Sequence, residues 1–319
     1  ADVFGSLPLD FVALFSSSSA FIAPQGQIDY VAANSFVNTF ADAHSGLRDY
    51  PTIALNWGIW RDVGLVAPSS DNTTTLTKLH ETQYPLFAAH RSGRDGLRET
   101  HRFEGVLSTS DWVIAEHRLK NNDALLPGTG YIELIRAALQ QINGKVPWTL
   151  SNLVFEQPLF VEDTNPRAFR VNLLGNSKSW QVSVEAADLT DPSSWSTCVR
   201  ASVKTEVVKP NPPVLDEIQS RFGHPTESVA GSGAIKTRQE AHLNFGRRWH
   251  VLKQIYMGDG EALGELKLPA DFATDLDTYL IHPGLLDIAT GFAMNLIPGY
   301  AEQEIAEALW VPLSYGAYT

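Results

Sequence analysis

Residues 130–144, GYIELIRAALQQING, decide the fold of the largest part of this 319-residue chain. The spacing of their apolar residues predicts a helix over about Gly130 to Gln141, which the pair Asn143-Gly144 ends. The predicted helix has one apolar stripe, made by Ile132, Ile135, Ala138 and Leu139. A stripe of this kind needs a partner surface, and the neighbouring sequence supplies one.

The segments that flank this helix alternate in polarity and predict short antiparallel strands. On this side of the chain they are Thr149–Phe155, Phe169–Leu174, Ser179–Ala186 and Trp195–Val203. The pattern then repeats, with a helix over about Pro283 to Ile297, ended by Pro298-Gly299. The strands predicted around it lie near Ile255, at Ala262–Leu268 and at Leu309–Ser314. A long helix wrapped by an antiparallel sheet, twice, predicts a doubled α+β domain.

The N-terminal part has a different pattern. Two short apolar runs, Asp10–Phe15 and Thr52–Trp57, predict buried parallel strands, and between them a helix is expected from Gly26 to about Ser45, closed by Gly46. Strand, helix and strand in this order form one right-handed α/β unit. About 67 residues with one crossover cannot cover both faces of a parallel sheet, so we expect only part of an α/β domain here.

Two stretches interrupt the periodicity, PSSDNTTT at 68–75 and KPNPP at 209–213. They predict an α/β segment at 1–67, a linker at 68–83, a first α+β half at 84–208 and a second half at 209–319, which we expect to be truncated. The first residue is not Met and the last residues read as an interrupted strand, so we expect the chain to be a segment of a larger polypeptide.

Composition narrows the function classes. Lys and Arg number 24 and Asp and Glu 36, so the net charge is −12 and no nucleic-acid partner is expected. No apolar run is long enough for a signal peptide or a membrane span, and we expect a cytoplasmic protein without membrane contact. The single cysteine, Cys198, excludes an internal disulfide and fits a buried structural role. No metal site is predicted, because His282 and Asp287 lack the spacing of helical ligands.

The first candidate site lies in the N-terminal part. Tyr30 and Asn34 are four residues apart on the predicted helix and share a face, and Ser17 follows the preceding strand. A phenol that donates a proton to a ketone, beside a serine that holds the same oxygen, suits carbonyl reduction. A purely structural role for each residue is the alternative.

Three stretches here, FSS at 15–17, GQIDYVAAN at 26–34 and LNWGIW at 55–60, resemble the end of a ketoreductase domain of a modular polyketide synthase. The resemblance covers about residues 1–67 and implies a partial Rossmann-like, short-chain dehydrogenase fold with Ser17, Tyr30 and Asn34 as its proton-donating site. NADPH serves such a domain when it is complete. No Gly-rich dinucleotide turn precedes Asp10, so this chain is not expected to bind NADPH or reduce a ketone.

The second candidate site combines one residue from each α+β half. His117 closes an apolar run, and Asp287 is expected in the first turn of the second helix, among apolar residues. Burial would raise the pKa of such a carboxyl, and a neutral imidazole can remove a proton near pH 7. A base and an acid are what elimination of water from a β-hydroxyacyl thioester requires. The alternative is that each is a structural residue.

The stretches YPLF at 84–87, LLPGTGY at 125–131, FGRRW at 245–249 and HPGLLD at 282–287 resemble a polyketide synthase dehydratase domain from Tyr84 to Thr319. The resemblance implies a double hotdog fold, His117 as base and Asp287 as acid. It also implies a tunnel for an acyl chain carried on the phosphopantetheine arm of an acyl carrier protein, a reaction without a cofactor, other synthase domains as partners and a possible homodimer. The substrate-binding residues it implies are Pro127, Gly128, Phe245, Gly246 and Gly291.

Several positions depart from the family pattern. Asn121 and Gly291 replace a usual glycine and a usual Gln or His, Phe245 and Tyr84 replace a usual Tyr and His, and one extra residue precedes Pro127. Two further readings therefore stay open. The domain could bind the intermediate or close a ring on it (an oxa-Michael, pyran-synthase-like reaction) without dehydration, or it could serve a ketoreductase as a docking or dimerisation surface.

Overall fold

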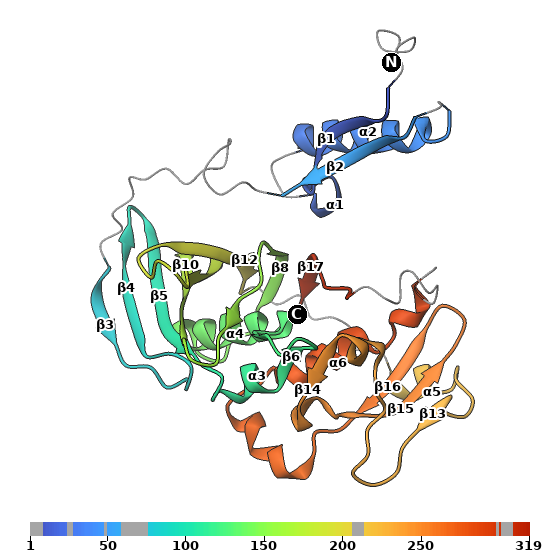
Figure 1. Cartoon of the computed structure of the whole chain (residues 1–319). Coiled ribbons are helices and arrows are strands. Elements are labelled where there is room, and N and C mark those ends of the chain that lie inside the picture. The colour runs from blue at the N-terminus through green and yellow to red at the C-terminus, as the bar shows by residue number, and fades with distance from the viewer. Residues whose placement is uncertain are drawn as a thin grey trace. The chain divides into compact units, whose positions relative to one another are not determined.

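The computed structural model describes residues 9–23, 28–47, 50–58, 76–205, 214–297, 300 and 309–319. The chain divides into two compact units, Ala1–Thr73 and Thr74–Thr319, and each is described by itself (Figure 1). Among these residues no helix is both long and apolar enough to cross a membrane.

The first unit is a parallel β-α-β arrangement, as its sequence predicts. Strand β1 (Val12–Ser17) pairs in parallel with β2 (Thr52–Trp57), and helices α1 (Ser19–Ile22) and α2 (Ile28–His44) lie between them in the chain. Gly46, at φ +78°, follows α2 in the left-handed conformation that glycine adopts without steric cost. The predicted start of this helix at Gly26 lies outside the described residues.

The second unit is built on an eight-stranded antiparallel sheet with the order β17-β8-β12-β11-β10-β5-β4-β3. Its strands are β3 (Leu76–His80), β4 (Ala89–Asp95), β5 (Arg98–Leu107), β8 (Thr149–Phe155), β10 (Arg167–Asn176), β11 (Ser179–Ala187), β12 (Trp195–Lys204) and β17 (Ser314–Tyr318). The sheet curls around α4 (Gly128–Asn143), drawn in green in Figure 1. This is the helix that residues 130–144 predict, and it is two residues longer at each end than predicted.

Helix α4 is buried over most of its length. The run from Thr129 to Leu139 is buried without interruption, including the charged Glu133 and Arg136, so the helix is enclosed well beyond its apolar stripe. It packs against the inward residues of the sheet, among them Phe103, Phe169 and Trp180. Helix and sheet form one continuous hydrophobic core, which makes this half a hotdog.

The second half is smaller. It has a three-stranded sheet of β13 (Glu227–Ser228), β15 (Leu252–Met257) and β16 (Ala262–Leu266) around helix α6 (Pro283–Gly291). The remaining helical segments are α3 (Trp112–Ala115), α5 (Leu215–Gln219), η1 (Arg238–Ala241), η2 (Arg247–Trp249), η3 (Ala270–Asp277) and η4 (Met294–Leu296). The prediction of a helix to Ile297 is wrong: α6 ends at Gly291, a poor helix former, and a separate 3₁₀ turn follows. The predicted end at 298–299 lies outside the described part.

The two halves share strands. A small sheet of the order β14-β6-β7-β9 joins β14 (Leu243–Phe245) from the second half to β6 (His117–Leu119), β7 (Ala124–Leu125) and β9 (Phe160–Val161) from the first. The register places Phe245 opposite His117. This pairing brings the two halves together at one of the candidate residues.

The last predicted strand is displaced. The sequence predicts Leu309–Ser314, whereas β17 begins at Ser314 and pairs with β8 of the first half. Pro312 lies within the predicted range and has no N–H for a strand ladder, which explains the shift. At the other edge of the sheet, β3 occupies part of the stretch predicted as a linker. Residues 68–75 and 209–213 lie outside the described ranges.

The edge of the large sheet carries three stacked histidines. The rings of His80 and His90 lie 4.5 Å apart, and His90 Nε2 is 2.9 Å from His101 Nδ1. Burial, and then the neighbouring His101 and His80, lower the pKa of His90 to about 4. His90 therefore folds in its neutral form.

This stack predicts a pH dependence of stability. Between pH 6.5 and 4 the unfolded chain protonates His90 and the folded chain does not. Protonation of His90 therefore lowers the free energy of unfolding as the pH falls from 6.5 toward 4, and has no effect on it above pH 6.5. A change of one pKa unit is worth about 1.4 kcal/mol, and we expect His90→Phe to remove about 2 kcal/mol of acid sensitivity. Chemical denaturation at pH 7 and pH 4.5 measures it. Equal acid sensitivity in both proteins would contradict the assignment.

Candidate active site

His117 is the first residue of β6, one residue after the end of the short helix α3, and its side chain is 8% exposed. Its Nδ1 lies 3.0 Å from the carbonyl oxygen of Leu125, which can only accept a hydrogen bond. Nδ1 therefore carries the proton, and in the neutral ring Nε2 is left as the free lone pair. The residue is built to present Nε2 as a base.

Asp287 lies on α6, with its side chain 15% exposed. The helix begins at Pro283, so Asp287 is its fifth residue. The sequence predicts Asp287 in the first turn, whereas the structure places it just beyond that turn. The helix dipole therefore acts on it less than expected. His282 caps the helix, and its Nδ1 accepts a hydrogen bond from the Leu285 N–H at 3.3 Å.

The structure brings these two groups together. His117 Nε2 and Asp287 Oδ2 are 3.9 Å apart, within the reach needed for an acid and a base to serve one substrate. Burial lowers the pKa of His117, and the Asp287 carboxylate partly offsets this. Burial also raises the pKa of Asp287, which His117 and a hydrogen bond from Trp249 oppose. Burial thus shifts both groups toward their neutral forms, which for His117 is the base and for Asp287 the acid.

Two aromatic rings enclose the imidazole. The rings of Phe245 and Trp249 stack at 5.9 Å, and each lies 5.7 Å from the His117 ring. The Trp249 indole N–H also donates to Asp287 Oδ2 at 2.8 Å. Trp249 is 2% exposed, and it touches both members of the acid–base pair.

A charged cluster supports these residues from their chain neighbours. Arg248 donates through its main-chain N–H to Glu116 at 2.7 Å and through Nε to Asp275 at 2.6 Å, and its guanidinium also pairs with Glu116. Asp275 lies 3.6 Å from His282, the cap of α6. Glu116 precedes His117 and Arg248 precedes Trp249, so the cluster fixes the backbone next to both of these residues. Composition and spacing give no signal for it.

The glycines predicted to bind substrate are tightly packed. A Cβ at Gly128 would lie 3.2 Å from the Phe155 ring, and one at Gly246 would overlap Glu116. A Cβ at Gly291 would lie 2.6 Å from Oε1 of Gln239. Pro127 is the N-cap of α4, two residues after the carbonyl that binds His117. Contact of these positions with a substrate stays a prediction.

The predicted ketoreductase residues are less connected. Ser17 donates to Ser19 at 3.1 Å, and the Asn34 amide donates to the main-chain oxygen of Tyr30 at 2.8 Å. Tyr30 is 50% exposed. Within the described part of this unit no hydrogen bond joins Ser17 to Tyr30. Ser17, Tyr30 and Asn34 are therefore not linked into one hydrogen-bonded site here.

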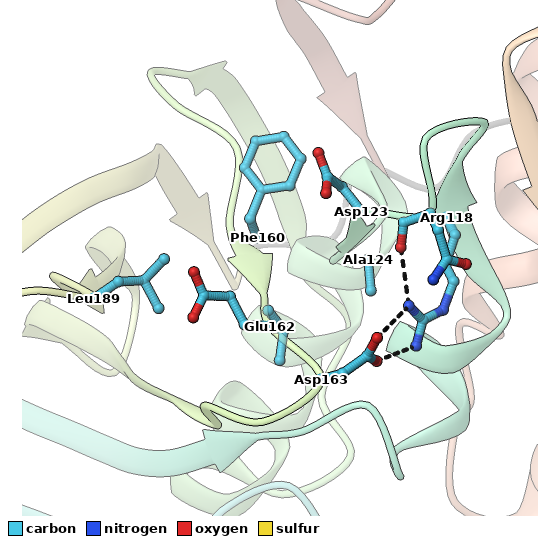
Figure 2. Close-up of a pocket in the computed structure, with 9 residues that line it drawn as sticks. Arg118, Asp123, Ala124, Phe160, Glu162, Asp163 and Leu189 are labelled. Carbon is cyan, nitrogen blue, oxygen red and sulfur yellow. Dashed lines mark hydrogen bonds and ion pairs between the residues drawn. The ribbon is translucent and has the colours of Figure 1, made fainter.

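One cavity lies beside the small shared sheet. It measures about 330 Å³, and its lining includes Arg118, Phe160, Asp163 and Leu189 (Figure 2). Arg118 Nη2 binds Asp163 at 2.7 Å across its wall. Neither His117 nor Asp287 lines it, so it is not the predicted acyl tunnel, which stays a prediction.

Three family models match the chain. The KR domain matches residues 1–62, the polyketide synthase dehydratase domain matches 84–187, and a model described as the polyketide synthase dehydratase N-terminal domain matches 215–318. The second and third matches cover the two hotdogs in turn.

Curated relatives and solved structures agree. Polyketide synthase PksN of Bacillus subtilis is 27% identical over 211 residues, 64% of this chain, and GfsB of Streptomyces halstedii is 26% identical over 271 residues, 78% of it. This chain spans only 4% of the length of either. The dehydratase domain from the CurF module of curacin polyketide synthase superposes with a TM-score of 0.60 at 18% identity, covering 73% of this chain and 82% of that one.

A trans-AT polyketide synthase dehydratase domain from Brevibacillus brevis superposes equally well, with a TM-score of 0.60 at 17% identity, over 74% of this chain and 80% of that one. At these identities the superpositions show the fold, a double hotdog. The chain therefore belongs to the polyketide synthases, with the C-terminal part of a ketoreductase domain followed by a dehydratase domain.

Proposed function

We propose that residues 84–319 eliminate water from a β-hydroxyacyl thioester tethered to the phosphopantetheine of an acyl carrier protein, giving an α,β-unsaturated thioester. The observation that carries the proposal is the 3.9 Å separation of His117 Nε2 and Asp287 Oδ2 in a largely buried setting. The carrier protein, the neighbouring synthase domains and a homodimer are the proposed partners.

The chemistry follows from the two groups. His117 Nε2 removes a proton from Cα, and the electron pair of that C–H bond forms the new Cα=Cβ double bond. The Cβ–O bond breaks, and its oxygen leaves as water after taking the proton of the Asp287 carboxyl. Each group is worth on the order of 10²–10⁴ in rate. Proton transfer alone balances the reaction, so it requires no cofactor.

A carrier-bound 3-hydroxyacyl thioester incubated with the full chain tests the proposal by intact mass spectrometry. Loss of one water supports dehydration. An isomer of unchanged mass, formed from a hydroxy-enoyl substrate and separated by chromatography after hydrolysis of the thioester, would indicate ring closure instead. No change with either substrate would leave only binding, and would overturn the proposed activity.

A further inference from the structure

We propose that Trp249 is a positioning residue for the elimination: its indole N–H anchors one oxygen of Asp287 while its ring holds the His117 imidazole at a fixed separation from that carboxyl. The inference rests on the proposed function and extends it to a residue that takes no part in the proton transfers.

The anchoring bond is short and directional. Trp249 Nε1 donates to Asp287 Oδ2 at 2.8 Å. Oδ2 is also the oxygen that faces His117 Nε2. This hydrogen bond therefore fixes how the carboxyl is oriented relative to the imidazole. The indole thus holds in place the carboxyl that delivers the proton to the departing hydroxyl.

No other side chain shares this task within the described part of the molecule. One helical turn after Asp287 stands Gly291, and the amide of Gln239 fills the space that a side chain there would need. Gln239 Oε1 is itself shielded and without a hydrogen-bond donor among the described residues. Among the described residues, the hydrogen bond that the structure shows on the Asp287 carboxyl comes from the Trp249 indole and not from the Gln239 amide.

The ring of Trp249 is held on several sides. It stacks on Phe245, contacts Trp112 edge-on at 6.0 Å, and packs on Gly284 of α6, where a Cβ would lie 3.2 Å from Trp249 Cδ2. Close packing on these sides restricts the movement of the ring, which contacts both α6 and the imidazole.

The titratable groups that face Asp287 are His117 and Tyr315 of β17. Burial raises the pKa of Tyr315, so its phenol is neutral. Removing the indole donor disfavours the Asp287 carboxylate and raises the apparent pKa at which the pair loses its shared proton. The alkaline limb of the pH–rate profile should therefore move to higher pH.

The test uses the full chain with a 3-hydroxyacyl thioester of N-acetylcysteamine. Two variants remove the donor: Trp249→Phe, and replacement of the Trp249 indole by benzothiophene, which keeps the ring shape. For both we expect kcat to fall about 10- to 100-fold with little change in KM, since a displacement of about 1 Å can cost 10²-fold. Their alkaline limb should shift upward.

Trp180→Phe is the matched control. This indole is fully buried in the large sheet, and its N–H has no hydrogen-bond partner among the described residues. Its replacement should leave both kcat and the pH profile unchanged. If Trp249→Phe does not fold, the benzothiophene variant decides the question.

A second readout does not depend on activity. ¹³C NMR of labelled aspartate side chains, with the Asp287 signal assigned by Asp287→Asn, follows the titration of the carboxyl. A wild-type protein that fails to dehydrate would overturn the proposed function, and the donor-free variants would still test the anchor. Variants that titrate like the wild type and, where the wild type is active, keep its kcat would overturn the role of Trp249.

Discussion

Replacing His117 with alanine should slow elimination by about 10²- to 10⁴-fold while the protein stays folded. The substitution removes the group that we propose takes the α-proton, and it leaves Asp287 and its bond to Trp249 in place. Single-turnover conversion of a carrier-bound 3-hydroxyacyl thioester measures the loss.

The matched control is His224→Ala, because His224 is an exposed histidine of the same dehydratase region. It should retain wild-type turnover. Near-UV circular dichroism checks that both variants keep their tertiary packing. A folded His117→Ala protein with undiminished turnover would remove the imidazole from the mechanism.

The second large effect concerns the ion pair inside α4. Glu133 is 1% exposed and Arg136 6% exposed; two hydrogen bonds of 2.7 Å join them, and Glu133 also accepts from the Ile281 N–H at 3.0 Å. We expect Glu133→Ala to destabilise the dehydratase unit by about 3–5 kcal/mol, because it leaves a buried guanidinium without its partner. Chemical denaturation measures the change.

A double variant separates the lost pair from the lost side chain. Glu133→Leu combined with Arg136→Met removes both charges, and should recover most of the stability that Glu133→Ala loses. Glu104→Ala breaks the exposed pair with Arg91 and should cost less than about 1 kcal/mol. A Glu133→Ala protein as stable as the Glu104→Ala protein would contradict the role of the buried pair.

Local hydrophobic periodicity predicts most of the helices and strands of the dehydratase unit. The stripe on α4 and the alternation of β8, β11 and β12 are visible within a dozen residues, and the structure confirms these elements close to their predicted bounds. The pairing of β17 with β8 joins segments about 160 residues apart, and no local pattern encodes it. The end of α6 was missed for a similar reason, since its packing against η1 is a tertiary contact.

The site was predictable in its chemistry and not in its support. His117 and Asp287 stand out because a histidine and a carboxyl in apolar surroundings are unusual, and the motifs around them resemble a known family. Trp249 lies in the FGRRW stretch that carries the resemblance, but nothing in that stretch marks its indole as a hydrogen-bond donor to Asp287. Its hydrogen bond to Asp287 arises where η2 meets α6, 38 residues further along the chain. The Glu116, Arg248 and Asp275 cluster was invisible for the same reason.

Stereospecific labelling at Cα tests most directly whether the imidazole and the carboxyl work on one substrate from one side. With the reacting atoms 3.9 Å apart, both must approach the same face of the Cα–Cβ bond. From a 3-hydroxyacyl thioester deuterated at a single Cα position, the enzyme should remove the label only when it lies on the side of the departing hydroxyl. Loss of the label from the opposite side would contradict a paired His117 and Asp287.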